Sequence, residues 1–118
     1  MPEVPYRVEK PWGYELIWAV TDRYVGKILH VKAGHVLSCQ YHNRKDETMY
    51  VLSGTLILRT AESESAPLQE RPFLAGQSVR IPPLLVHQME AVTDSDVLEA
   101  STPELDDLVR ITDRYGRS

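Results

Sequence analysis

The chain has 118 residues and a mass of 13.5 kDa, which suits one domain and leaves no room for a second. Hydrophobic residues make up 42% of the chain and charged residues 25%, close to the averages of globular proteins, which excludes disordered, collagen-like and coiled-coil chains. Thirteen Lys and Arg against seventeen Asp and Glu give a net charge of −4 with no long basic cluster, so no nucleic-acid partner is expected.

The amino-terminal segment and the cysteine content both favour a cytoplasmic protein. Charged residues interrupt the apolar residues of segment 1–18, so no signal peptide is expected. No apolar run approaches the roughly 20 residues needed to cross a membrane, and no membrane partner is expected. The one cysteine, Cys39, cannot form an intramolecular disulfide, so the chain needs no oxidising compartment.

Short runs of apolar and β-branched residues, separated by Gly and Pro, follow one another from residue 15 onwards. This pattern is typical of antiparallel β-proteins. It predicts eight strands, at residues 15–20, 26–31, 36–41, 48–52, 55–60, 78–81, 85–91 and 96–101. Eight short strands without a long helix can close as a small barrel or as a double-sheet jelly roll.

Three connecting segments carry their own local signals. Ser53-Gly54 predicts a tight hairpin in which Gly54 has a positive φ. Residues 60–72 are polar and contain two prolines, so they are expected to form an exposed loop. Thr102 and Pro103 have the types preferred at a helix N-cap and first position, which predicts a short helical turn at residues 104–109.

Four polar side chains of metal-ligand type lie on the predicted strands or directly beside them. Gln40 and His42 are two residues apart on one strand, so they share a face. Glu47 opens the next strand, so its carboxylate can reach back toward that face. His87 lies in an otherwise apolar strand. One amide oxygen, two imidazoles and one carboxylate make four possible ligands for a divalent metal.

This donor set indicates a transition metal, because imidazole suits Zn, Fe, Ni and Cu while the oxygen ligands also suit Mn and Co. Magnesium and calcium prefer shells made only of oxygen. We expect one divalent ion per chain, zinc first, with manganese, iron, cobalt or nickel as alternatives. A single carboxylate leaves the bound ion with a net positive charge, so it can act as a Lewis acid on a substrate hydroxyl or carbonyl.

The spacing of these residues resembles two motifs of the cupin superfamily. Gly34-x5-Gln40-x-His42-x4-Glu47-x6-Gly54 resembles the first motif, with Gln40 where the commoner form has histidine, and Gly76-x5-Pro82-x4-His87 resembles the second. Within the superfamily the chain is similar, over about residues 11–117, to the small C-terminal domain of type II mannose-6-phosphate isomerases, usually fused to a mannose-1-phosphate guanylyltransferase. The segments that carry this similarity are Pro11-Trp12-Gly13-Tyr14, Gln40-x-His42 with Glu47, Asp106-Asp107-Leu108-Val109-Arg110 and Asp113-Arg114-Tyr115-Gly116-Arg117.

The resemblance implies an all-β fold: a small jelly-roll (double-stranded β-helix) cupin barrel. Residues 1–118 would form one domain, with a core at about 11–101 and a C-terminal segment at 102–118 that contains the helical turn. The barrel mouth would hold a metal bound by Gln40, His42, Glu47 and His87, and the protein would be a sugar-phosphate isomerase that pairs as a homodimer.

Some positions depart from the pattern of that family. Leu84 stands where glycine is usual, Ala91 where asparagine often stands, and Asn43-Arg44 replaces a histidine-rich stretch. These changes spare the ligand set and weaken the assignment of the substrate. The nucleotidyltransferase part and a Gly-rich phosphate loop are both missing, so guanylyltransferase activity is not expected.

Aldose–ketose interconversion also needs a base and a group that binds phosphate. Glu47 and Glu99 are the candidate bases, and Glu90, Tyr41 and a metal-bound hydroxide remain open. Phosphate is best bound by Arg or Lys. The candidates are Lys27, Arg59 and Arg80, with Arg110 and Arg117 added if the C-terminal segment folds over the barrel mouth.

Two other classes of function remain open at this stage, because one fold hosts several chemistries. One is a non-catalytic cupin that binds a metal and a sugar, and the other is an Fe(II)-dependent cupin dioxygenase.

Overall fold

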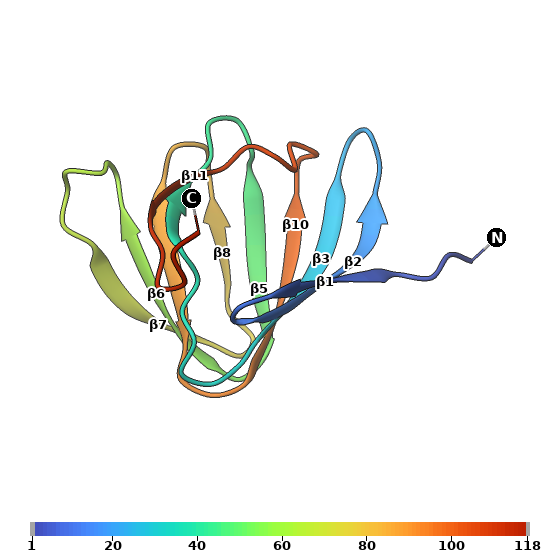
Figure 1. Cartoon of the computed structure of the whole chain (residues 1–118), viewed down its shortest axis with the longest axis horizontal. Coiled ribbons are helices and arrows are strands. Elements are labelled where there is room, and N and C mark those ends of the chain that lie inside the picture. The colour runs from blue at the N-terminus through green and yellow to red at the C-terminus, as the bar shows by residue number, and fades with distance from the viewer. Residues whose placement is uncertain (1, 118) are drawn as a thin grey trace.

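Two antiparallel β-sheets make up the computed structural model, which describes residues 2–117 (Figure 1). Their strand orders are β1-β2-β3-β10-β5-β8 and β11-β4-β9-β6-β7. The strands are β1 (Tyr6–Lys10), β2 (Gly13–Val20), β3 (Val25–Val31), β4 (Cys39–Tyr41), β5 (Glu47–Ser53), β6 (Thr55–Ala61), β7 (Gln69–Leu74), β8 (Ser78–Ile81), β9 (Val86–Ala91), β10 (Ser95–Ser101) and β11 (Val109–Thr112). Residues 2–117 contain no helix, and so none that could cross a membrane. The predicted all-β jelly roll is confirmed.

The inward side chains change from polar to apolar along the strands. On β5, Glu47, Met49 and Val51 are buried and point inward, while the residues between them are exposed. The partner strand β10 places Ser101 opposite Glu47 and Val97 opposite Val51, and β9 runs from His87 to Ala91. One end of the interior is therefore an apolar core, and the other end is polar. The polar end holds all three buried candidate ligands.

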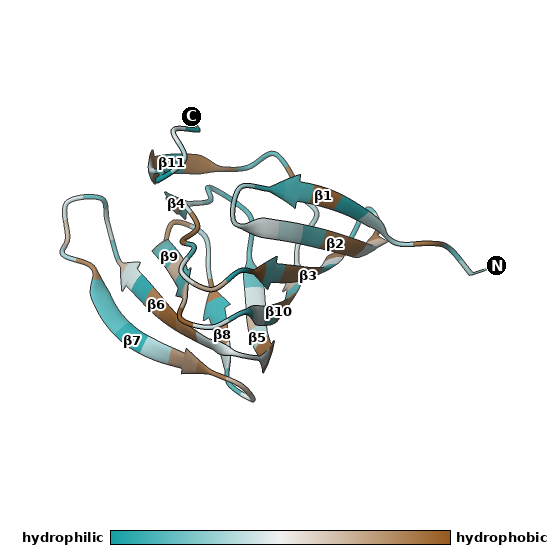
Figure 2. Cartoon of the chain, turned by 60° about the horizontal axis from the view of Figure 1, so that its bottom comes forward, coloured by the Kyte–Doolittle hydropathy of each residue, from teal (hydrophilic) through white to brown (hydrophobic). Residues whose placement is uncertain are grey.

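Strands β1, β7 and β11 were missed by the sequence analysis. Strand β1 precedes the first predicted strand, and β7 occupies the end of the segment expected to be a loop at residues 60–72. Both strands lie at sheet edges, and Figure 2 shows hydrophilic residues along much of each. On β7 only Phe73 is buried, and Pro72 is tolerated because an edge strand needs no second hydrogen-bonding partner. Such strands lack the apolar alternation that predicts a strand.

The predicted helical turn at residues 104–109 is wrong. The chain makes a turn near Leu105 and then forms β11, which pairs with β4 so that Arg110 lies opposite Gln40. A helix of one turn would leave most of its backbone groups without partners, whereas pairing with the free edge of β4 satisfies them. The C-terminal segment therefore lies beside the polar end of the interior.

The predicted hairpin at Ser53-Gly54 is also wrong, although Gly54 has the expected positive φ, 94°. Strands β5 and β6 belong to different sheets and do not pair, so Gly54 forms a corner where the chain crosses between the sheets. A Cβ atom on Gly54 would overlap Ser95 Oγ and the carbonyl oxygen of Asp94. Sheet assignment depends on partner strands distant in the chain, so the local sequence could not distinguish a corner from a hairpin.

We expect Gly54→Ala to lower the free energy of unfolding by about 2–4 kcal/mol, because the left-handed backbone and the overlap both oppose a side chain. Urea unfolding measures this loss. Gly34→Ala is the matched control, because Gly34 has a φ of 80° but nothing within 4 Å of the added atom. It is expected to lose only the backbone contribution, about 1–2 kcal/mol. Equal losses in the two variants would contradict the overlap.

Candidate metal centre

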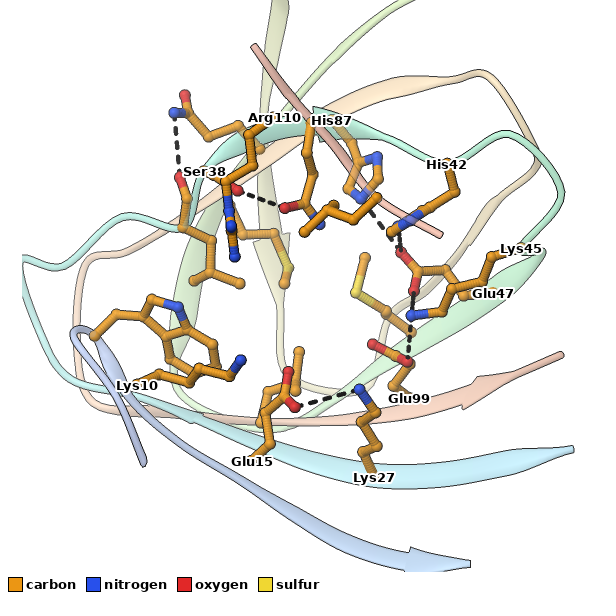
Figure 3. A pocket seen from close by; sticks show the side chains of 18 of the residues that line it. Lys10, Glu15, Lys27, Ser38, His42, Lys45, Glu47, His87, Glu99 and Arg110 are labelled. Carbon is orange, nitrogen blue, oxygen red and sulfur yellow. Dashed lines mark hydrogen bonds and ion pairs between the residues drawn. The ribbon is translucent and has the colours of Figure 1, made fainter. Parts of the chain in front are cut away.

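Three of the predicted ligands converge at the polar end of the interior (Figure 3). Glu47 Oε1 lies 3.5 Å from His42 Nε2 and 3.3 Å from His87 Nε2. One ligand atom from each residue lies within 4.8 Å of the other two, and all three side chains are buried. His42 directly follows β4, Glu47 begins β5 and His87 lies on β9, so tertiary folding brings the three residues together.

Hydrogen bonds from the far side of each imidazole fix how the two rings face the centre. His42 Nδ1 lies 2.6 Å from the carbonyl oxygen of Asp107, and His87 Nδ1 lies 3.0 Å from that of Leu85. A carbonyl oxygen only accepts, so both Nδ1 atoms must donate a proton, and both Nε2 atoms face Glu47. Metal-binding histidines are oriented in this way.

His42 Nε2 supplies an independent test of fit for a metal. This atom is buried and has no hydrogen-bond partner among residues 2–117. A buried nitrogen without a partner is costly unless a ligand occupies its lone pair. Two imidazoles and one carboxylate also form the donor set that a divalent transition metal prefers. The cluster is therefore compatible with such an ion.

Gln40 lies next to this cluster. It is the cross-strand partner of His87 and lines the same cavity. Its Oε1 accepts a hydrogen bond from the hydroxyl of Ser38. Its role as a fourth ligand stays a prediction.

The sequence analysis missed Lys45. Its ammonium nitrogen lies 3.2 Å from Glu47 Oε2 and 3.1 Å from Glu99 Oε2, and the side chain is only 8% exposed. Burial alone would lower the pKa of Lys45, but the charges of Glu99 and Glu47 raise it above its usual value, so Lys45 stays protonated. A lysine in a polar turn is expected from the sequence to be exposed to solvent. No local sequence signal distinguishes a buried lysine such as Lys45 from an exposed one.

The two buried carboxyl groups have opposite pKa shifts. Burial alone would raise the pKa of Glu47. The contacts with His42 and His87 and the charge of Lys45 outweigh burial and lower the pKa below its usual value, so Glu47 stays ionised. Burial and the Glu47 charge raise the pKa of Glu99, which Lys45 and Lys27 only partly offset. The two candidate bases therefore have different environments: Glu47 faces the imidazoles, whereas Glu99 faces Lys45.

Asp107 connects the C-terminal segment to the centre. Its carboxylate accepts backbone N–H bonds from Asn43, Arg44 and Lys45, at 2.9, 2.6 and 2.8 Å. The bonds from Arg44 and Asn43 are the main cause that lowers the pKa of Asp107 to about 2. Its own carbonyl oxygen accepts from His42. Asp107 thus fixes both the His42 ring and the turn that carries Lys45.

A cavity of about 160 Å³ opens onto the cluster. The C-terminal segment lines part of this cavity. This was the condition under which Arg110 and Arg117 became candidates for binding phosphate. Lys27 also lines it and lies 3.3 Å from Glu15 (Figure 3). The basic side chains in its lining are Lys10, Lys27, Lys45, Arg110 and Arg117.

Arg59 and Arg80 lie elsewhere. Arg59 pairs with Glu70 and Glu90 on the outer side of its sheet, and Arg80 is 64% exposed and pairs with Asp46. Neighbouring residues on β6 and β8 point inward, so strand alternation turns these two outward. Neither arginine lines the cavity, and neither do Glu90 and Tyr41, two of the bases left open.

Comparison with known proteins identifies the family. The chain matches the family described as "Mannose-6-phosphate isomerase C-terminal" over residues 3–113. The chain belongs to this family. It is 37% identical over 116 residues to "Mannose-1-phosphate guanylyltransferase" of Escherichia coli K12, which covers 93% of this chain and 23% of that protein. It is 32% identical over 118 residues to "Xanthan biosynthesis protein XanB" of Xanthomonas campestris, covering 95% of this chain and 24% of that protein.

The chain thus spans about a quarter of the length of these two relatives. Solved cupin structures share its fold. KdgF from Halomonas sp. superposes with a TM-score of 0.74 at 21% identity, over 86% of this chain and 88% of KdgF. CapF from Staphylococcus aureus gives a TM-score of 0.72 at 19% identity, over 97% of this chain and 31% of CapF. At these identities the similarity confirms the cupin fold and carries nothing about substrate.

Proposed function

We propose that this protein is a metal-dependent cupin that interconverts an aldose phosphate and a ketose phosphate, as mannose-6-phosphate isomerases do. The convergence of the His42, Glu47 and His87 ligand atoms beside a cavity lined by both basic and acidic side chains carries this proposal. Family membership supports it, although the relatives named above are much longer proteins.

His42, Glu47 and His87 would hold the metal, with Gln40 as the fourth ligand. We propose zinc as the ion, with manganese, iron, cobalt and nickel as alternatives that also accept nitrogen and oxygen ligands. When bound, the ion would supply Lewis-acid polarisation of the substrate's hydroxyl and carbonyl oxygens.

Glu99 is the side chain that we assign to proton transfer between the two reacting carbons. It lines the cavity and is 6% exposed, and burial raises the pKa of its carboxyl group. A carboxylate with a raised pKa is a stronger base. Glu47 is less suited to this role, because its carboxylate faces the two imidazoles and would be a ligand of the metal.

Basic side chains in the cavity would bind the phosphate. Arg110 projects between Ser38 and His87 in Figure 3, and Lys10 also lines the cavity. Arg117 lines it too, with its guanidinium paired to Asp113. Guanidinium groups match phosphate geometry with two parallel hydrogen bonds. Lys27 lies on the opposite side of the cavity, paired with Glu15.

We further propose that the protein works as a homodimer in the cytoplasm. Exposed apolar side chains on the six-stranded sheet, Trp18, Tyr50 and Leu52, support a partner on that face. Sedimentation at micromolar concentration is expected to give twice the chain mass of 13.5 kDa. A monomer at every concentration would refute the dimer.

The experiment that tests the function is conversion of mannose 6-phosphate to fructose 6-phosphate by the purified protein. We expect a chelator to abolish turnover and added zinc, manganese, cobalt or iron to restore it. His87→Ala is expected to abolish both metal binding and turnover. His30→Ala is the control, because His30 pairs with Asp96 away from the cavity lining.

Metal binding without isomerisation by any of these ions would refute the assignment of mannose 6-phosphate and leave a metal-binding cupin whose substrate is to be found by screening. Oxygen consumption that requires Fe(II) would instead favour a dioxygenase.

A further inference from the structure

Lys45 occupies a position that the metal centre itself does not require. Its ammonium group bridges Glu47 Oε2 and Glu99 Oε2, at 3.2 and 3.1 Å (Figure 3). Lys45, Glu47 and Glu99 are 6%, 3% and 6% exposed. Burying a charged lysine is costly unless opposite charges surround it. The backbone N–H of Lys45 also donates a hydrogen bond to the Asp107 carboxylate, so both the backbone and the ammonium group of Lys45 are held in place.

The bridge gives the two oxygens of Glu47 different partners. Oε1 faces the His42 and His87 nitrogens, at 3.5 and 3.3 Å. Oε2 is held by Lys45 on the other side of the carboxylate. The carboxylate therefore offers one oxygen to an ion bound between the imidazoles.

The same ammonium group restrains a second carboxylate. Glu99 lies on β10 opposite Met49, two residues along β5 from Glu47, and points into the same cavity. Without a bridging cation, Glu99 would be a further oxygen donor close to the centre. Its charge would then be balanced mainly by whatever cation occupies the site.

The number of oxygen donors affects which ion a site prefers. Oxygen-rich shells suit manganese, magnesium and calcium, whereas imidazole-rich shells suit zinc, cobalt and nickel. We propose that Lys45 sets the metal preference of the centre, by holding Glu47 to one coordinating oxygen and by keeping Glu99 out of the coordination shell. Lys45 is thus a positioning residue, and this inference rests on the metal centre of the proposed function.

The test is calorimetric titration of the metal-free full chain with Zn²⁺ and with Mn²⁺. We expect Lys45→Met to bind Mn²⁺ more tightly, so that the preference for Zn²⁺ falls by about 10- to 100-fold, the size of effect typical of residues that orient ligands. Lys45→Arg keeps the charge and is expected to retain the preference. The absorption spectrum of bound Co²⁺ is expected to shift toward the weaker bands of higher coordination number in Lys45→Met.

Lys10→Met is the control, because Lys10 lines the same cavity, whereas the lysine that pairs with Glu47 and Glu99 is Lys45. It is expected to leave the ratio of the two affinities unchanged. The double variant Lys45→Met/Glu99→Gln removes both members of the second ion pair and tests the contribution of Glu99. We expect it to regain part of the zinc preference.

If Lys45→Met fails to fold, comparison of the double variant with Glu99→Gln carries the test, because losing the lysine still frees Glu47 Oε2. An unchanged affinity ratio and Co²⁺ spectrum in every Lys45 variant would overturn the inference while leaving the metal centre intact. A wild-type protein that binds neither ion would overturn the proposed function, and this inference with it.

Discussion

Glu99→Gln is expected to lower kcat for isomerisation by about 10²- to 10⁴-fold, the usual contribution of a general base. The amide has nearly the same shape as the carboxylate but cannot accept a proton at neutral pH. Because Glu99 pairs with Lys45 rather than facing the imidazoles, the variant is expected to keep its metal. Steady-state kinetics together with metal analysis of the same preparation measures both effects.

Glu90→Gln is the matched control for this experiment. Glu90 lies on β9, as His87 does, but its carboxylate pairs with Arg59 outside the cavity lining. Its kcat is expected to stay at the wild-type level. If Glu99→Gln turned over at the wild-type rate with its metal bound, proton transfer would belong to another group in the cavity.

The second large effect is expected from Asp107→Ala, a substitution that changes none of the candidate ligand residues. Loss of the carboxylate removes three backbone hydrogen bonds from the turn that joins His42 to Glu47. The turn then no longer holds these two ligands at a fixed separation. We expect the affinity for Zn²⁺ to fall by about 10- to 100-fold, as for other residues that orient metal ligands.

Asp106→Ala is the control, because Asp106 is the exposed neighbour of Asp107. Calorimetric titration of both variants gives the comparison. Equal Zn²⁺ affinity in Asp107→Ala and the wild type would show that the turn keeps its shape without the carboxylate.

The fold class and the candidate ligands could be predicted because their signals are local. Alternation along single strands places Gln40 and His42 on one face, and the spacing to Glu47 and His87 matches the cupin motifs. The structure brings His42, Glu47 and His87 together as that spacing predicts. Edge strands such as β7 carry no such signal, since little of their surface is buried.

The amino-acid sequence by itself therefore determined the all-β class, the family and the three residues that converge at the centre. Tertiary structure alone decided that Lys45 is buried between two carboxylates and that Asp107 anchors its turn. It also turned Arg59 and Arg80 away from the cavity and made residues 109–112 a strand. These outcomes depend on which strands pair and which faces they enclose. The residues that contact each other are at least 34 positions apart in the sequence in three pairs, Arg80 with Asp46, Lys45 with Glu99 and Asp107 with Asn43. No local pattern specifies such contacts.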